Sequence, residues 1–351
     1  MRHDFEDLKR FASQLLAAAG LEADKATTVA RLLASADAMG HSTHGLAQLA
    51  DYLGDIETGA MRTRGEPSTI SDRGVALVWD GERLPGVWLT ARAVDLAADR
   101  AAIHGLCAIS IRRSHHIGCL AAVLPAATRR GMMAIIASSD PSAAMVAPFG
   151  GLRGVLTPDP IAVGIPTPGD PILIDMSSSI TTAAMSARLR QAGARYPGQW
   201  AIDAKGRASD DPRVLADEPA GALLPAGGLD HGQKGYGLAL MVEALTQGLS
   251  AHGRADGDTQ WGASVFVQVF DPALFGGADG FTRQTGFLAD LCRATPPIDN
   301  SRPVRLPGDS AMRGLREAEA RGVELHAGIL ETLNALAMRH GVAGPAVVGA
   351  A

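Results

Sequence analysis

The spacing of apolar residues changes twice along this chain, and that change constrains the fold more than any other feature. Residues 5–59 and 310–340 carry apolar side chains three and four positions apart, which is typical of amphipathic helices. From about residue 70, short runs of branched apolar residues alternate with Gly/Pro loops, which indicates strands. The pattern predicts an α/β protein whose two chain ends form a helical lobe beside a strand-rich middle.

The boundaries of these elements follow from the same pattern. Residues 1–70 and 290–351 are expected to form the helical lobe, and residues 71–289 one or more strand-rich lobes. Helices are predicted at 5–19 (with Asp4 as cap), 24–38, 46–59, 89–104, 119–130, 180–192, 236–250 and 310–340. Strands are predicted at 75–79, 106–112, 132–138, 161–165, 171–176 and 264–270.

Composition excludes several classes of function. The net charge of −5 argues against a nucleic-acid partner, because phosphate binding needs a concentrated positive patch. No uncharged apolar run reaches the roughly 18 residues of a membrane span, and the acidic N-terminus has no apolar signal core. Three widely spaced cysteines (Cys107, Cys119 and Cys292) are expected to be buried free thiols. These features predict a cytoplasmic protein with no membrane partner.

The usual phosphate-binding loops are missing from the sequence. No Gly-x-Gly-x-x-Gly follows a predicted strand, and there is no Gly-Lys-Ser/Thr phosphate loop. A dinucleotide, if one binds, therefore does so without the Rossmann turn.

Two short glycine-terminated loops hold paired histidines, His41-Ser-Thr-His-Gly45 and Ser114-His-His-Ile-Gly118. Histidine is the usual proton-transfer group near pH 7, so the loops are candidates for an active site. Solvated histidines in a helix-capping turn would give the same pattern. A metal site is disfavoured, because adjacent side chains on an extended segment point in opposite directions and no cysteine or carboxylate has zinc-like spacing beside them.

Two further segments could contact a ligand. Lys234 lies between glycines just before a predicted helix, where backbone N–H groups and a cation could bind a diphosphate; a solvated loop lysine is the alternative. Asp175 ends an apolar strand and is followed by Ser177–Ser179. It could accept hydrogen bonds from ribose hydroxyls or orient a histidine, or it could cap the helix predicted from residue 180.

Taken in order, eight segments resemble the NAD(P)-dependent malate/L-lactate dehydrogenases that lack a Rossmann fold. This family also includes ureidoglycolate and sulfolactate dehydrogenases, diketogulonate reductase and piperideine-2-carboxylate reductase. The segments are Thr43-His-Gly45 with Tyr52, Ser114-His-His-Ile-Gly118, Ala147-Pro-Phe-Gly-Gly151, Asp159-Pro-Ile-Ala162, Leu173-Ile-Asp-Met176, Gln199-Trp-Ala-Ile-Asp203, Lys234-Gly-Tyr-Gly-Leu238 and Arg305-Leu-Pro-Gly-Asp309.

The resemblance implies a mixed-sheet α/β fold peculiar to the family, a homodimer, and hydride exchange between NAD or NADP and C2 of a small 2-hydroxy or 2-oxo acid. By position, His44 corresponds to the family's proton donor and His116 to a proton acceptor named in some members. Thr43 and Gln48 correspond to substrate-binding positions, and no metal is implied. The cofactor-binding positions, all but three in the predicted strand-rich part, are Ser139, Ile174, Asp175, Met176, Ser177, Lys234, Gly235, Pro307, Gly308 and Asp309.

Departures from the family pattern leave the substrate open. Gln48 stands where relatives often have the arginine that meets the substrate carboxylate, and a neutral amide cannot form a charge-assisted bidentate pair. Ala183-Ala-Met185 replaces an Arg-Gly-Lys, Thr157-Pro-Asp-Pro160 replaces Gly-Thr-Asn-Pro, and Thr43 replaces serine. A malate, lactate, ureidoglycolate or sulfolactate type of substrate, a cyclic imine 2-carboxylate, and a catalytically silent homologue that binds dinucleotide or acid all fit these residues.

Overall fold

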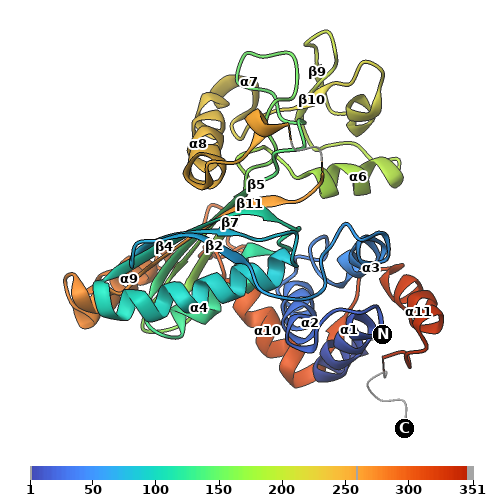
Figure 1. The fold of residues 1–351 in the computed structure, drawn as a ribbon. Helices are drawn as coiled ribbons and strands as arrows, with labels where there is room; N and C mark the ends of the chain where they lie inside the picture. The colour runs from blue at the N-terminus through green and yellow to red at the C-terminus, as the bar shows by residue number, and fades with distance from the viewer. Residues whose placement is uncertain (1, 258–259, 346–351) are drawn as a thin grey trace.

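A seven-stranded mixed sheet lies at the centre of the protein, in a computed structural model that describes residues 2–257 and 260–345 (Figure 1). The strand order is β2-β3-β4-β11-β5-β6-β7, and every neighbouring pair is antiparallel except β3 and β4. The strands are β2 (Ser68–Asp72), β3 (Ala76–Asp80), β4 (Leu106–Ser114), β5 (Met133–Ser139), β6 (Ile161–Ile165), β7 (Ile172–Met176) and β11 (Ala263–Phe270).

The late strand β11 is the middle of this sheet. It inserts between β4 and β5, so that Val267 pairs with both Ile109 and Ile136, and all three side chains are fully buried. Branched apolar residues favour such a central position because both faces of the strand are covered. The insertion also brings the loop before Ala263 next to the end of β4.

Helices from both chain ends pack together on one side of the molecule (Figure 1). A two-stranded ladder ties the ends together, with Arg2–His3 (β1) paired to Val323–Glu324 (β12). Asp4 accepts the Asp7 N–H and caps α1, as predicted. The helices are α1 (Phe5–Ala18), α2 (Ala23–Ala38), a 3-10 turn (Leu46–Gln48), α3 (Leu49–Thr58), α10 (Asp309–Arg321) and α11 (Ile329–His340).

The remaining helices cover the sheet and build a third layer. The helix α4 (Gly86–His104) packs along β4 and β11. On the other side of the sheet, a small lobe carries α6, α7, α8 and a three-stranded sheet (Figure 1). The elements outside the helical group are α5 (Pro125–Thr128), α6 (Ala183–Gln191), β8 (Ala201–Ile202), β9 (Ala208–Ser209), β10 (Ala222–Leu223), α7 (Gly228–His231), α8 (Gln233–Glu243) with a π-helical extension (Ala244–Gly248), and α9 (Ala278–Arg293).

The structure confirms the α/β class with a mixed sheet, and it corrects several elements. The helix predicted at 119–130 is a 3-10 turn followed by the four-residue α5, and the predicted terminal helix is broken at 322–328. The helix predicted from residue 236 begins at Gln233, so Lys234 lies inside its first turn. Both β2 and α9 were not predicted.

Two predictions from composition can be compared with the structure. The three cysteines are free thiols, as predicted; Cys107 and Cys119 are buried as expected, whereas Cys292 is only partly buried. Within the part of the chain that the structure describes, no helix is both long and apolar enough to cross a membrane.

Candidate active site

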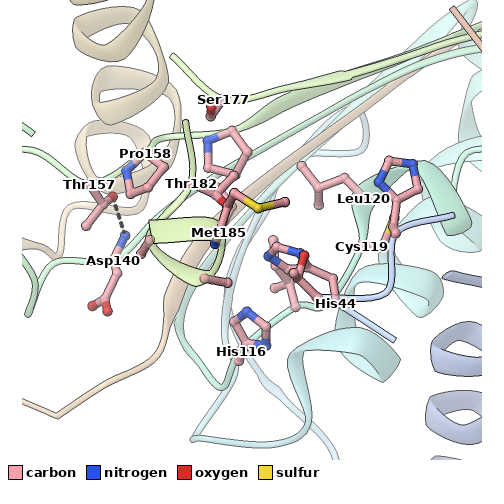
Figure 2. A pocket seen from close by; sticks show the side chains of 18 of the residues that line it. His44, His116, Cys119, Leu120, Asp140, Thr157, Pro158, Ser177, Thr182 and Met185 are labelled. Carbon is pink, nitrogen blue, oxygen red and sulfur yellow. Dashed lines mark hydrogen bonds between the residues drawn. The ribbon is translucent and has the colours of Figure 1, made fainter. Parts of the chain in front are cut away.

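A cavity of about 710 Å³ lies where the helical lobe, the sheet and the small lobe meet. Its wall comes from the loop between α2 and α3, the segment after β4, the ends of β5 and β7, the start of α6 and the loop before β11. Figure 2 shows His44 and His116 together on one side, with Thr182, which precedes α6, and Met185 of α6 across from them. Cavities of this size and mixed lining are typical of cofactor and substrate sites.

The end of α2 shapes the first histidine loop. Gly40 has a φ of +88°, a left-handed conformation that glycine adopts without strain. An Asp37 carboxylate oxygen accepts the Leu46 N–H at 2.7 Å, and a Cβ at Gly45 would overlap that carboxylate. The Thr43 hydroxyl lies 2.9 Å from His44 Nδ1, so the hydroxyl that replaces the family serine sets the orientation of the ring.

The second histidine loop is fixed by charge pairs at the exit of β4. The buried Asp80 accepts hydrogen bonds from Arg112 and Arg113, the last residues before the loop. Gly86, at the start of α4, touches the His115 carbonyl so closely that a Cβ there would overlap it. The loop therefore leaves the strand in one direction, which places His116 in the cavity wall.

The two histidine loops meet in the cavity. The rings of His44 and His116 are stacked with centroids 5.9 Å apart, and Trp261 also stacks on His116, with centroids 5.0 Å apart. The Tyr52 hydroxyl lies 2.9 Å from His116 Nδ1. When that hydroxyl donates to Nδ1, the Nε2 of a neutral His116 carries the hydrogen. The ring is thus held in place by three neighbours.

The other two histidines have different surroundings. His115 is buried, and its Nε2 lies 3.1 Å from an Asp55 carboxylate oxygen; its ring packs edge-on against Tyr52 and Trp261. Burial lowers its pKa to about 4. His115 therefore supports the rings around it, while His41 lines the cavity.

Burial also sets the protonation of the paired histidines. It lowers the pKa of His44, and the nearby Asp175 carboxylate partly opposes this shift. Burial, together with the neighbouring His44 and His115, lowers the pKa of His116 to about 3. At neutral pH His116 is therefore uncharged, and His44 is the more readily protonated member of the pair.

The segment after β7 forms another part of the wall. Asp175, Met176 and Ser177 line the cavity together with Ser139, while Ile174 pairs with Val163 inside the sheet. An Asp175 carboxylate oxygen accepts the Ala121 N–H at 2.8 Å. The idea that Asp175 caps the following helix is wrong, because the side chain of Thr182 caps α6. The hydroxyls of Ser177, Ser178 and Ser179 donate to backbone carbonyls.

The other predicted cofactor segments lie behind this wall. The Gly235 N–H donates to Ala226, whose own N–H donates to Ser178, so the start of α8 packs against the segment after β7. The Pro307 carbonyl accepts the Leu173 N–H, which brings Pro307, Gly308 and Asp309 to the start of β7. Neither Lys234–Gly235 nor Pro307–Asp309 belongs to the cavity wall that the described residues form.

Trp261 and Arg188 are among the wall residues that the sequence did not predict. Trp261 stacks on His116 although 145 positions separate them in sequence, and no local pattern marks it. Arg188 lines the cavity from α6 and donates to the Ser42 hydroxyl at 3.2 Å. A signal for Arg188 exists: it lies three residues after Met185, on the same helix face as the position where relatives carry a lysine.

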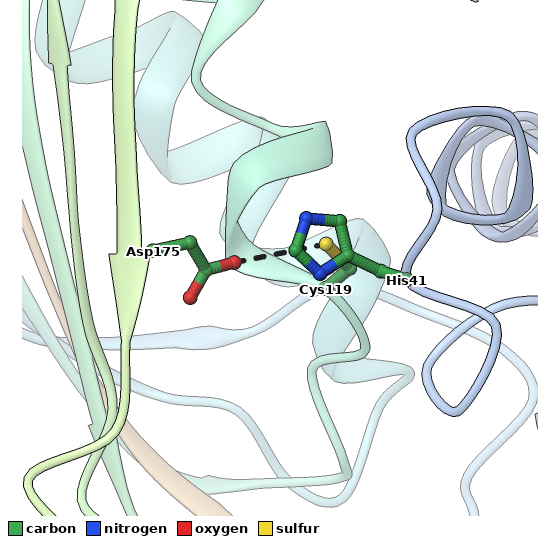
Figure 3. A group of neighbouring side chains, drawn as sticks. All are labelled: His41, Cys119 and Asp175. Atoms are coloured by element: carbon green, nitrogen blue, oxygen red, sulfur yellow. Dashed lines mark hydrogen bonds between the residues drawn. The ribbon is translucent and has the colours of Figure 1, made fainter. Parts of the chain in front are cut away.

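One cluster of possible metal ligands borders the cavity. His41, Cys119 and Asp175 each bring one ligand atom within 4.8 Å of the others (Figure 3). Hydrogen bonding accounts for part of this closeness, because the Cys119 thiol donates to Asp175 at 3.7 Å. Burial raises the pKa of that thiol well above its ordinary value, which opposes the thiolate that a metal would need. That the site holds no metal stays a prediction.

Known proteins resemble this chain over nearly its whole length. The sequence model of the malate/L-lactate dehydrogenase family matches residues 3–334. Hydroxycarboxylate dehydrogenase B of Escherichia coli K12 is 29% identical over 93% of this chain and 91% of its own length. The (2R)-3-sulfolactate dehydrogenase (NADP(+)) of Chromohalobacter salexigens is 30% identical over 95% of this chain and 97% of its own length.

A solved structure also has this fold. A putative malate/lactate dehydrogenase from E. coli superposes with a TM-score of 0.87 at 27% identity, covering 98% of this chain and 96% of that one. The non-Rossmann fold that the motifs imply is thereby confirmed.

Proposed function

This chain belongs to the malate/L-lactate dehydrogenase family and is an oxidoreductase that acts on hydroxy acids, and we propose that it transfers a hydride between NAD or NADP and C2 of a small 2-hydroxy or 2-oxo acid. One observation carries this proposal: His44 and His116 stack in the same cavity that Ser139 and the Asp175–Ser177 segment line. Groups for proton transfer thus lie beside groups that correspond to cofactor contacts.

The residues present fit a nicotinamide dinucleotide. The cavity is large enough for a bound cofactor portion and a small acid, and the first turn of α6 forms part of its wall. Backbone N–H groups at a helix N-terminus bind phosphate, and they offer a replacement for the cations missing at 183–185. The exposed Lys234 in the first turn of α8 adds a cation behind the same wall. The bound cofactor would supply or accept the hydride.

The histidines then divide the work on the proton. Reduction of a ketone at C2 requires one proton at the oxygen, and the reverse reaction requires a base that removes it. We assign the exchange of this proton to His44: burial lowers its pKa, and the Asp175 carboxylate partly opposes that shift. His116 stays neutral and presents its Nε2–H to the substrate oxygen, with Tyr52 and Trp261 fixing the ring.

A screen of substrates with both cofactors tests the proposal. Absorbance of NADH and NADPH is followed with 2-oxo acids of the pyruvate, oxaloacetate and sulfopyruvate types and with a ureidoglycolate. Turnover of at least one acid is expected, with a loss of about 100-fold or more in His44→Ala and in His116→Ala. His104→Ala, which changes an exposed histidine at the end of α4, is the control. No turnover of any acid would refute the proposal.

The same screen separates the two alternatives. A cyclic imine 2-carboxylate that is reduced faster than every ketone would identify a C=N reductase with the same hydride and proton sites. Tight NADH or NADPH binding by calorimetry without reduction of any compound would identify a silent homologue.

We also propose that the protein is a homodimer. Exposed apolar side chains gather on α9 and on the turn before it, where Phe275, Phe287, Leu288 and Leu291 are each more than half exposed. A second copy that covers such a surface would bury it from water. Light scattering during size-exclusion chromatography tests this, and a monomer mass at micromolar concentration would refute it.

A further inference from the structure

The charged groups of the cavity wall are unevenly distributed. Among the described residues that line it, Arg188 is the only lysine or arginine, whereas Asp51, Asp140 and Asp175 contribute carboxyl groups. A substrate acid enters this cavity as an anion. It therefore meets several groups that repel its charge and one guanidinium that attracts it.

Arg188 has hydrogen-bonding capacity to spare. Its one hydrogen bond to a described residue goes to the Ser42 hydroxyl, and no ion pair joins it to a described carboxylate. A guanidinium has five N–H donors in a planar fork that matches a carboxylate, so four remain for a ligand. The side chain is half-buried, which strengthens such a contact relative to the protein surface.

Arg188 also lies close to the reacting groups. Its bond to Ser42 places the guanidinium beside the loop that carries His44. Its charge is one of the influences that lower the pKa of His44, which requires the two groups to be near each other. A carboxylate bound by Arg188 would put the adjacent C2 atom within reach of the histidine pair.

Gln48 cannot take this role as the side chain stands. Its amide nitrogen donates to the Thr43 carbonyl at 2.9 Å, so it stabilises the histidine loop from inside. At the position where relatives often have a carboxylate-binding arginine, Gln48 thus stabilises the loop instead.

We propose that Arg188 binds the substrate carboxylate, and that the preferred substrate is a singly charged 2-oxo acid whose C3 substituent is uncharged. This inference rests on the function proposed above. A second anionic group, as in a dicarboxylate or a sulfonate, would find no second lysine or arginine among the described residues of the wall. Leu120, Met145 and Met185 in the same wall favour an apolar substituent.

The test compares two arginines of α6. Arg188→Gln removes the proposed ligand, and Arg190→Gln removes an equal charge from an exposed position on the same helix. Loss of a charge-assisted bidentate contact is expected to raise the KM for the best 2-oxo acid about 100-fold, with a much smaller change in kcat. Arg190→Gln should leave both constants near those of the wild type, and Arg188→Lys should restore part of the affinity.

Binding of oxamate, an unreactive pyruvate analogue, to the NADH complex gives a readout that needs no turnover. Calorimetry should show Arg188→Gln binding oxamate about 100-fold more weakly while NADH affinity changes less than threefold. If the wild type reduces a 2-oxo acid but Arg188→Gln behaves as Arg190→Gln does, the inference is wrong and the proposed function stands. If the wild type neither reduces an acid nor binds oxamate, both are wrong.

The charge of the substrate is tested in the same assays. The wild type is expected to have a kcat/KM at least tenfold higher for monocarboxylic 2-oxo acids with apolar C3 groups than for oxaloacetate or sulfopyruvate. The reverse order would overturn this part of the inference, even if Arg188 binds the first carboxylate.

Discussion

The buried acid Asp159 makes a strong prediction about stability. Its side chain is fully buried, and it stands where relatives have an asparagine. The Thr157 hydroxyl donates to one carboxyl oxygen, while the other has no hydrogen-bond partner. Burial raises the pKa of this carboxyl from its ordinary value of 3.8 to about 8. At neutral pH Asp159 is therefore a neutral acid that resembles asparagine in shape.

The size of the effect follows from proton linkage. Between pH 3.8 and about 8 the folded protein keeps a proton that the unfolded chain releases. Folding is therefore favoured most at low pH, and this contribution is lost as the pH rises to the folded pKa. The slope is about 1.4 kcal/mol per pH unit, or roughly 4 kcal/mol between pH 4 and pH 7. Asp159→Asn removes the titrating group and with it this slope.

Urea unfolding of the wild type and of Asp159→Asn at several pH values measures the difference in free energy of unfolding. The titration of every other group cancels in that difference. The free energy of unfolding of the variant, relative to that of the wild type, should increase steadily from pH 4 to pH 8, whatever the difference is at pH 4. Asp217→Asn, which makes the same exchange at an exposed loop carboxyl, is the matched control. A difference between Asp159→Asn and the wild type that does not change with pH would refute the reasoning.

Three further predictions concern the histidine loops. Gly45→Ala should lower the free energy of unfolding by about 1–3 kcal/mol, because its methyl group would overlap the Asp37 carboxylate; an unchanged urea midpoint would contradict this. Tyr52→Phe leaves His116 Nδ1 without its partner and should lower kcat about tenfold with unchanged cofactor affinity, which steady-state kinetics and NADH titration would check. In the oxidation direction, where His44 must be neutral, kcat/KM should rise through a pKa below 6.5, because burial lowers the pKa of that group; a midpoint above 7 would count against His44.

Apolar spacing was enough to predict the elements that bury a continuous face. The strand β6 has the predicted bounds, and α1 differs by one residue, because each carries apolar side chains at the period of its own structure. Both β2 and α9 lack such a face. Four of the five residues of β2 are exposed, and in α9 only Gly286 and Ala289 are buried. Their positions depend on neighbouring elements, about which a local pattern carries no information.

The candidate site likewise combines residues that the sequence predicted with residues that only the fold brings together. Histidines in glycine-terminated loops were conspicuous in sequence, and the structure brings His44 and His116 together. The rest of the wall comes from segments that only the fold makes adjacent. Trp261 reaches His116 because β11 inserts beside β4, and that strand order cannot be read from either segment alone. Asp37 stabilises the first loop by accepting the backbone N–H of Leu46, nine residues away. An aspartate at this position of a helix does not by itself indicate such a contact.

Gln48 stands where relatives often have arginine. This replacement illustrates how a chemical role can be taken over by a residue at another position of the chain. An anion in a cavity needs a cation near its carboxylate, and position 48 does not provide one, because Gln48 is a neutral amide that donates to the Thr43 carbonyl. The opposite wall provides a cation, because Arg188 of α6 lies against the same loop and donates a hydrogen bond to the Ser42 hydroxyl. A carboxylate bound there is held from the small lobe, while His44 approaches its C2 atom from the loop after α2 and His116 from the segment after β4. Substrate choice then depends on how α6 packs over the loop, so changes in α6 should alter KM more than changes at position 48 do.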